Sequence, residues 1–235
     1  IEPQPARLSI WSNTEKGWAE ERLEDPDSNV FHKALPFEDG ILTLSGEKAI
    51  VKYWTRRDGV WTATQIWAKN WGGKFNRMRD VEFADLDGDG TNEMILATHD
   101  QGVLAVGSRG KTGEWSFTEL GQKPDTFVHE IEVGDVDGDG QVEFYGTPSA
   151  RNRGDLSSQA GGVVQYAYVD GKYVGKDVVT WTDTHAKEIF VTKGKPSLLY
   201  AVKEASVTAP VQVVSLVPQD GAFVETVVAT LNGEK

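Results

Sequence analysis

The sequence predicts an all-β fold, a β-propeller built from four-stranded blades. A strand hairpin recurs about every 50 residues, and a second pair of short strands lies between successive hairpins. Four strands per roughly 50 residues is the spacing of propeller blades. Apolar residues alternate at a period of two or form short β-branched blocks, whereas a helical solenoid would need a period of 3.6. We therefore predict strands throughout the chain and no helix.

The recurring hairpin has a Gly in its turn and an aromatic side chain within two residues after it. Gly tolerates positive φ and Asp can bond its own turn backbone, so the turns at 57–59, 170–171 and 220–221 suit tight hairpin reversal. The aromatic residues at this position are Trp18, Trp61, Trp115, Tyr173 and Phe223. The three tryptophans are expected to pack between neighbouring blades.

The second pair of strands is clearest at 80–98 and 130–147, two copies with an offset of 50 residues. Copies at 34–46 and 188–202 keep the strand pattern but have lost most or all of the acidic loop between the strands. The chain thus encodes about four full blades plus an extra outer hairpin, and the ring does not close as written. Three alternatives would account for this number of strands. Further residues could complete a larger ring, for example of seven blades. One blade could instead be two-stranded, or a second chain could supply the missing strands.

The length and composition limit the classes of protein to which this chain can belong. Its 235 residues are enough for one all-β domain, so we treat 1–235 as a single propeller domain or propeller fragment. A formal charge of −12 disfavours non-specific nucleic-acid binding, which needs clustered Lys and Arg. No apolar run approaches the ~20 residues that cross a bilayer. The absence of cysteine excludes disulfides and Cys-based zinc sites but does not fix the compartment.

Two acidic loops, 85–93 and 135–143, carry the clearest chemistry. In each, carboxylates stand at positions one, three, five and nine, and Gly stands at positions four and six. These carboxylates are Asp85, Asp87, Asp89 and Glu93 in the first loop, and Asp135, Asp137, Asp139 and Glu143 in the second. Position seven, Thr91 or Gln141, would contribute a backbone carbonyl.

This pattern predicts two Ca²⁺ sites. Calcium takes six to eight oxygen ligands, and a tight Gly-containing turn can wrap three nearby carboxylates around one point. Without a cation, two carboxylates ~5 Å apart repel by about 3 kcal/mol at an effective dielectric constant near 20. An acidic hairpin turn that is solvated without metal is the plain alternative, and the repetition of the loop in two repeats argues against it.

An EF-hand loop opens with the same triplet of aspartates but does not fit the residues that follow. An EF-hand needs Glu at position twelve and flanking helices, whereas position twelve is Leu96 in one copy and Gly146 in the other. The flanking residues at 81–83 and 94–96 are typical of strands. The loops are therefore predicted to be nine-residue turns between two strands.

The segments 83–94 and 133–144, with their DxDGDGxxE cores, resemble FG-GAP/VCBS repeats, which build integrin-α-like propellers. The resemblance implies that each loop joins the first and second strands of a blade and binds Ca²⁺ through positions one, three, five, seven and nine. Both copies match at all five positions. The corresponding segments around Glu38 and Glu188 depart from the motif, so no calcium is expected there.

Polar residues on or just before the predicted innermost strands are expected to converge at the mouth of a central channel. They are Arg77, Arg79, Asp80, Glu82, His129, Glu130, Glu132, His185, Lys187, Glu188, His32 and Lys33. A hydrated channel whose charges pair with one another is the plain interpretation. The alternative is a site for an ion, an anion or a sugar, in which His129 and Glu130 would act as acid or base.

Three further features are weaker. No HxH or HExxH spacing occurs, so the histidines are expected to be structural rather than zinc ligands. Trp71, followed by two glycines, could present its indole to a sugar, although packing between blades is the simpler prediction. The tripeptide 153–155, Arg-Gly-Asp, lies in the longest irregular segment and is expected to be a chance occurrence in a loop.

These features favour a non-enzymatic binding or scaffold protein that two Ca²⁺ ions stabilise and that recognises a protein or carbohydrate partner. By analogy with the resembled family, we expect it to be secreted, periplasmic or on the cell surface. The competing hypothesis is a carbohydrate-active enzyme, similar to a polysaccharide lyase, with His129, Glu130 and Arg79 at the channel mouth. No nucleophile elbow, phosphate-binding loop or dinucleotide fingerprint anchors a catalytic function.

Overall fold

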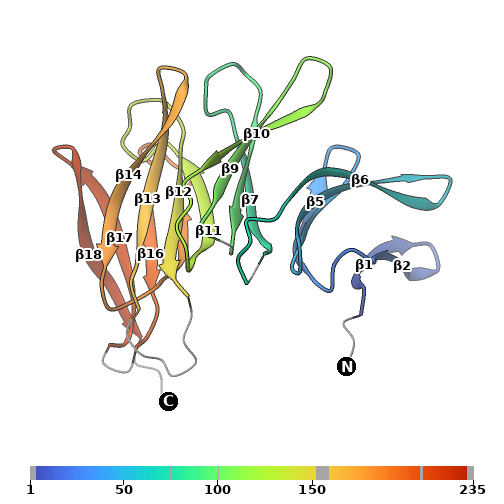
Figure 1. The fold of residues 1–235 in the computed structure, drawn as a ribbon, viewed down its shortest axis with the longest axis horizontal. Coiled ribbons are helices and arrows are strands. Elements are labelled where there is room, and N and C mark those ends of the chain that lie inside the picture. Colours follow the sequence, from blue (N-terminus) through green and yellow to red (C-terminus); the bar gives the residue numbers. More distant parts are fainter. Residues whose placement is uncertain (1–3, 75, 100, 152–158, 207–208, 232–235) are drawn as a thin grey trace. The chain divides into compact units, whose positions relative to one another are not determined.

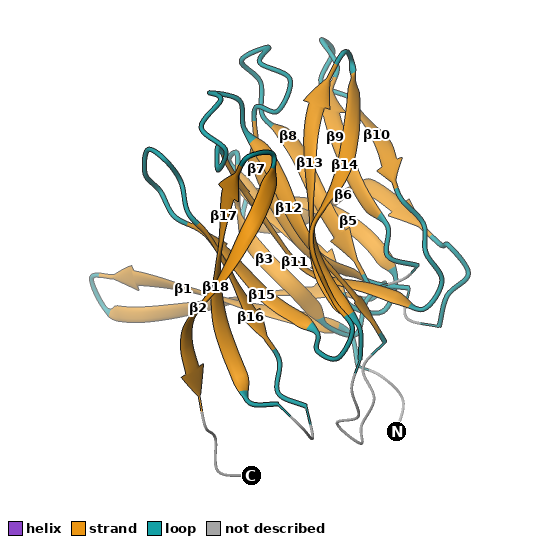
Figure 2. Cartoon of the chain, turned by 90° about the vertical axis from the view of Figure 1, so that its left-hand side faces the viewer, coloured by secondary structure: helices purple, strands orange, loops and turns teal. Residues whose placement is uncertain are grey.

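The computed structural model describes residues 4–74, 76–99, 101–151, 159–206 and 209–231. Strands are the only regular secondary structure in these residues (Figure 2). Within the described ranges there is accordingly no helix long and apolar enough to span a membrane. The chain forms two compact units, 1–80 and 81–235.

The N-terminal unit begins with a two-stranded hairpin, β1 (Ala6–Thr14) and β2 (Gly17–Asp25). A four-stranded antiparallel sheet follows in chain order, with strands β3 (Phe31–Phe37), β4 (Gly40–Ser45), β5 (Ala49–Arg57) and β6 (Val60–Lys69). Lys52 on β5 ties the hairpin to this sheet, because its ammonium lies 2.6 Å from Oδ1 of Asp25 and 2.7 Å from Oδ2 of Asp27. The hairpin is thus the predicted outer pair of strands that lacks an inner pair.

Three more four-stranded antiparallel sheets follow along the chain (Figure 1). The first has β7 (Met78–Ala84), β8 (Glu93–Thr98), β9 (Leu104–Arg109) and β10 (Trp115–Leu120). The second has β11 (Thr126–Gly134), β12 (Glu143–Ala150), β13 (Gly161–Val169) and β14 (Lys172–Trp181). The third has β15 (Ala186–Val191), β16 (Leu199–Lys203), β17 (Val211–Gln219) and β18 (Ala222–Leu231). The strands of each sheet are neighbours in chain order, as in a propeller blade.

Turn chemistry sets the outer hairpins, as predicted. Both central residues of the β13–β14 turn have positive φ, 50° at Asp170 and 80° at Gly171, and the flanking Val169 and Lys172 are paired. The same two-residue geometry joins β5 to β6 and β17 to β18. Positive φ at both positions gives a turn whose twist matches that of the strands, and Asp-Gly adopts it at low cost.

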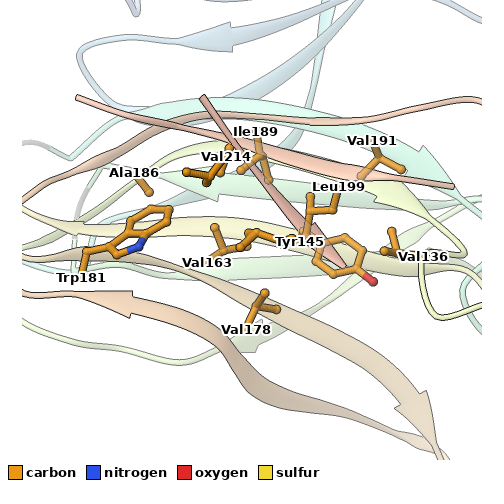
Figure 3. Packing of buried hydrophobic residues seen from close by; sticks show 12 residues of the cluster. Val136, Tyr145, Val163, Val178, Trp181, Ala186, Ile189, Val191, Leu199 and Val214 are labelled. Carbon is orange, nitrogen blue, oxygen red and sulfur yellow. The ribbon is translucent and has the colours of Figure 1, made fainter. Parts of the chain in front are cut away.

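The sheets of the C-terminal unit pack face to face through apolar side chains. β11 contacts both β8 and β15, so the middle sheet has a neighbour on each side. One core cluster contains Ile95 and Val106 from the first of these sheets, Leu86 from the loop between β7 and β8, and Ile131 and Phe144 from the middle sheet. A second cluster joins the middle sheet to the last one; Figure 3 shows Tyr145, Val163 and Trp181 packed with Leu199 and Val214.

The predicted all-β fold of four-stranded antiparallel sheets is confirmed. The extent of the propeller domain over 1–235 and the size of the complete ring stay predictions. Trp18 differs from expectation: it is 69% exposed on the two-stranded hairpin. Trp181, whose position falls outside the repeat of aromatic residues, is instead buried and donates a 2.8 Å hydrogen bond to Glu225.

Candidate metal centre

The acidic loops occupy equivalent places in two neighbouring sheets. The first connects β7 to β8, and the second connects β11 to β12. Each therefore joins the first and second strands of its sheet, as the family resemblance implied. The buried strand residues on either side, such as Ala84 and Met94, hold the two ends of the first loop close together.

Both loops have the same hydrogen-bonded backbone. In the first, Oδ1 and Oδ2 of Asp85 accept the N–H groups of Gly88 and Gly90 at 2.9 and 3.0 Å. In the second, Asp135 accepts the equivalent N–H groups of Gly138 and Gly140 at 2.8 and 3.1 Å. All four glycines have φ between 77° and 94°, a conformation that disfavours a residue with a Cβ. Glycine at positions four and six is thus what lets the loop fold around its first aspartate.

The second loop brings four carboxylates to one point. One oxygen from each of Asp135, Asp137, Asp139 and Glu143 lies within 4.8 Å of the others. Glu143 is only 2% exposed and forms the buried side of the group, whereas Asp137 and Asp139 face solvent. The donors are all oxygens and they surround one small volume, which fits a hard cation such as Ca²⁺.

The first loop brings three carboxylates together, those of Asp85, Asp87 and Asp89. Glu93 is also 2% exposed, and its Oε2 accepts the Leu86 N–H at 2.9 Å, but it does not join that group. The N–H groups of Thr91 and Gln141 donate to the aspartate at position five of their loops, at 2.7 and 2.8 Å. Ligation by Glu93 and by the carbonyls of Thr91 and Gln141 stays a prediction.

Electrostatics at the second loop favour a bound cation. Burial, followed by repulsion from Asp137, raises the pKa of Glu143 to about 7, and burial also raises the pKa of Glu93. A buried carboxylate beside other carboxylates is unfavourable when charged, unless a positive charge compensates for it. Bound to the loop, a Ca²⁺ ion would supply that charge and would be held by Asp135, Asp137, Asp139 and Glu143.

The residue at position two of each loop ties the loop to the next sheet. Leu86 is 3% exposed and belongs to the core cluster with Ile131 and Phe144, while Val136 is 3% exposed and packs in the cluster with Leu199 and Val214. The first loop also faces the second loop across a cavity of 570 Å³, lined by Asp85 and Asp87 on one side and by Gly140 and Gln141 on the other. Ordering of the loops is therefore linked to packing between sheets.

Three histidines on or directly beside strands of successive sheets lie together in the C-terminal unit. Nε2 of His99 is 3.1 Å from Nδ1 of His129, and the ring centroids of His129 and His185 are 5.7 Å apart. His99 also stacks on Phe127 at 4.5 Å. The position of His99 at the end of a second strand gave no sign of this pairing, which depends on contact between sheets.

The role of the candidate acid–base residues stays a prediction, and the structure describes the surroundings of each one. His129 is 1% exposed and hydrogen-bonded to His99, and the Glu130 backbone N–H donates to Thr147 Oγ1 at 2.9 Å. Arg79 belongs to the N-terminal unit, and His129 and Glu130 to the C-terminal one. The tripeptide 153–155 lies outside the described residues.

Sequence reasoning missed one residue next to the second loop. Tyr145 is fully buried, and its hydroxyl donates to Oε2 of Glu143 at 3.1 Å and accepts from Nε2 of Gln165 at 3.2 Å. Alternation along β12 places Tyr145 on the same face as Glu143, a signal that the sequence contains. Its hydrogen-bonding role could not be read from that pattern, because Gln165 comes from a different strand.

Comparison with known proteins agrees with this geometry. The family model described as an FG-GAP-like repeat matches residues 85–146, from the first aspartate of the first loop to the strand after the second loop. No curated protein sequence matches the chain significantly. Residues 85–146 of this β-propeller-like chain are therefore an FG-GAP-like repeat.

Proposed function

We propose that this protein is a calcium-stabilised propeller module that binds a protein or carbohydrate partner and has no catalytic activity of its own. The group of four carboxylates in the second loop, with Glu143 buried at its base, carries the proposal. The carboxylates of such a group repel one another without a cation and are stabilised when a cation binds. Calcium would therefore hold the two strands and the loop between them in place.

Calcium suits the site better than zinc or magnesium. The groups contain only oxygen donors, whereas structural zinc sites in proteins use Cys and His. Magnesium demands near-ideal octahedral geometry and keeps several waters, while calcium accepts irregular sets of protein oxygens. We expect the loop carbonyls of Thr91 and Gln141 to complete the two calcium sites.

The same chemistry supports the proposal of an extracytoplasmic location. Asp137 and Asp139 are exposed, which favours modest affinity. Extracellular modules bind calcium with dissociation constants of about 10⁻⁴–10⁻³ M, which the calcium concentration outside cells can satisfy. FG-GAP repeats are commonly extracellular, which supports a secreted, periplasmic or cell-surface protein.

The loops would stabilise the fold, and the partner would bind elsewhere. Trp71, the candidate for contact with a sugar, lies edge-on to Trp67 with ring centroids 5.7 Å apart, so packing between the two indoles competes with that role. The burial of His129 gives no support to the lyase-like alternative. We therefore propose that the function of this protein is to bind a protein or glycan ligand.

The test combines stability with binding. The protein, freed of metal, is melted in EDTA, in Ca²⁺ and in Mg²⁺, and is then screened with the same additions against a glycan panel and against uronate polysaccharides for cleavage. We expect calcium to raise the Tm because it binds the native state, with about 2.7 kcal/mol gained at 100 times the dissociation constant. A Tm that calcium leaves unchanged would contradict the calcium site, and formation of unsaturated sugar products would contradict the non-enzymatic role.

A further inference from the structure

The two acidic loops share every predicted ligand position and the same backbone hydrogen bonds, yet they gather different sets of carboxylates. Glu143 joins Asp135, Asp137 and Asp139, whereas Glu93 does not join the equivalent group. Both glutamates are 2% exposed, so burial alone does not explain the difference. The neighbours of the two carboxylates therefore have to be compared.

The two strands carry different residues two positions after the glutamate. In the second loop this residue is Tyr145, whose hydroxyl donates to Oε2 of Glu143. In the first loop it is Ile95, which is fully buried and has no group that could donate. Side chains two apart on a strand share a face, so each residue lies next to its glutamate.

Tyr145 is itself held firmly. It is 0% exposed in the core cluster between the last two sheets, its ring meets that of Phe223 edge-on at 6.5 Å, and its oxygen accepts a hydrogen bond from Gln165. Gln165 is 8% exposed, so this chain of hydrogen bonds is shielded from water. A buried donor with a locked rotamer can fix the orientation of the carboxylate that it contacts.

We propose that Tyr145 is a positioning residue that holds the Glu143 carboxylate in the second loop, and that the second loop therefore binds calcium more tightly than the first. The inference rests on the calcium binding proposed above. A hydroxyl orients the carboxylate without cancelling its charge, whereas a Lys or Arg at this place would compete with the metal. Pre-orientation removes the entropy cost of ordering a long side chain when calcium binds.

The experiment uses two background variants, each of which keeps the carboxylates of one acidic loop and lacks two carboxylates of the other. Asp85→Asn with Asp89→Asn leaves the second loop, and Asp135→Asn with Asp139→Asn leaves the first. Calcium is titrated calorimetrically into each background, with and without Tyr145→Phe. Tyr166→Phe is the matched control, because Tyr166 pairs with Phe144, which the alternation along β12 places on the opposite face from Glu143.

We expect Tyr145→Phe to weaken calcium binding about 10- to 100-fold where only the second loop remains, the range found when a group that orients a metal ligand is removed. Binding at the first loop should not change, and neither background should respond to Tyr166→Phe. Equal weakening in both backgrounds, or none, would overturn the role of Tyr145.

Two further outcomes are distinguishable. If neither background nor the unmodified protein binds calcium, the proposed function fails and this inference fails with it. If Tyr145→Phe does not fold, Gln165→Met takes its place, because it removes the donor to the Tyr145 hydroxyl while leaving the hydroxyl present. We then expect severalfold weaker binding at the second loop only, and unchanged binding there would overturn the inference.

Discussion

Nε2 of His99 and Nδ1 of His129 lie 3.1 Å apart, so one proton bridges two rings that come from neighbouring sheets. His185, 2% exposed, extends the row to the next sheet. Glu204 Oε2 lies 3.3 Å from Nδ1 of His185, and Lys187 lies 3.9 Å from the other oxygen of Glu204. His129 and His185 are buried in this row, and burial lowers the pKa of His185, which makes the packing around this ring sensitive to acid.

The first prediction concerns pH. Burial lowers the pKa of His185, although Glu204 opposes the shift, so the folded protein binds this proton less readily than the unfolded chain. The contribution of neutral His185 to the free energy of unfolding is complete above the pKa of ~6.5 that this side chain has in the unfolded chain. It is lost as the pH falls below that value, by up to about 1.4 kcal/mol per pH unit. Thermal melts between pH 8 and pH 5 should show a shallower decline for His185→Asn than for the unmodified protein. Parallel curves would contradict this role.

The second prediction concerns the buried ion pair of the N-terminal unit. The Lys52 and Asp25 side chains are 8% and 2% exposed and 2.6 Å apart. Lys52→Met leaves a buried carboxylate without its partner, which should cost about 3–5 kcal/mol. Lys52→Met combined with Asp25→Asn should recover part of this loss, as urea unfolding of the four proteins in a double-mutant cycle would measure. Additive effects of the two substitutions would show that the pair is not coupled.

The third prediction concerns the link between the first loop and the next sheet. Leu86 is 3% exposed in the core cluster, so Leu86→Ala should destabilise the protein by about 2–5 kcal/mol through lost burial and a residual cavity. Leu198→Ala is the control, because Leu198 is 39% exposed. Denaturant midpoints measure both. An effect of Leu86→Ala no larger than that of the control would contradict the packing described for the loop.

The fourth prediction distinguishes the destabilising effect of the Glu143 charge in the metal-free protein from its stabilising effect as a calcium ligand. At pH 8 in EDTA, Glu143→Gln should raise the Tm, because burial and Asp137 hold the pKa of this carboxyl at about 7 and its charge is unfavourable without metal. A gain of about 1 kcal/mol corresponds to roughly 2–4 °C for a chain of this size. In calcium the same substitution should lower the Tm relative to the unmodified protein. Glu15→Gln, at an exposed position, should change neither value.

Most of the fold could be predicted from the sequence because its signals are local. Alternation, Asp-Gly turns and the repeated acidic loops each act within a few residues, and the structure has the predicted outer hairpins and inner strand pairs. The loop ligands could be located for the same reason, since Gly138 and Gly140 fix the turn around Asp135.

Features that depend on contact between strands or sheets could not be predicted. The pairing of His99 with His129 needs two neighbouring sheets, and the hydrogen bond from Gln165 to Tyr145 needs a register that no single strand encodes. The exposure of Trp18 has the same origin, because the repeat pattern does not reveal that its hairpin forms a sheet of only two strands.

The central claim is that the two acidic loops are calcium sites. The most direct measurement is the number of calcium ions bound per chain by metal-free protein, from calorimetric titration at millimolar calcium, repeated with Asp85→Asn and Asp135→Asn. We predict two ions for the unmodified protein and one for each variant, with the remaining site unchanged. Absence of binding, or equal stoichiometry in all three proteins, would contradict the account.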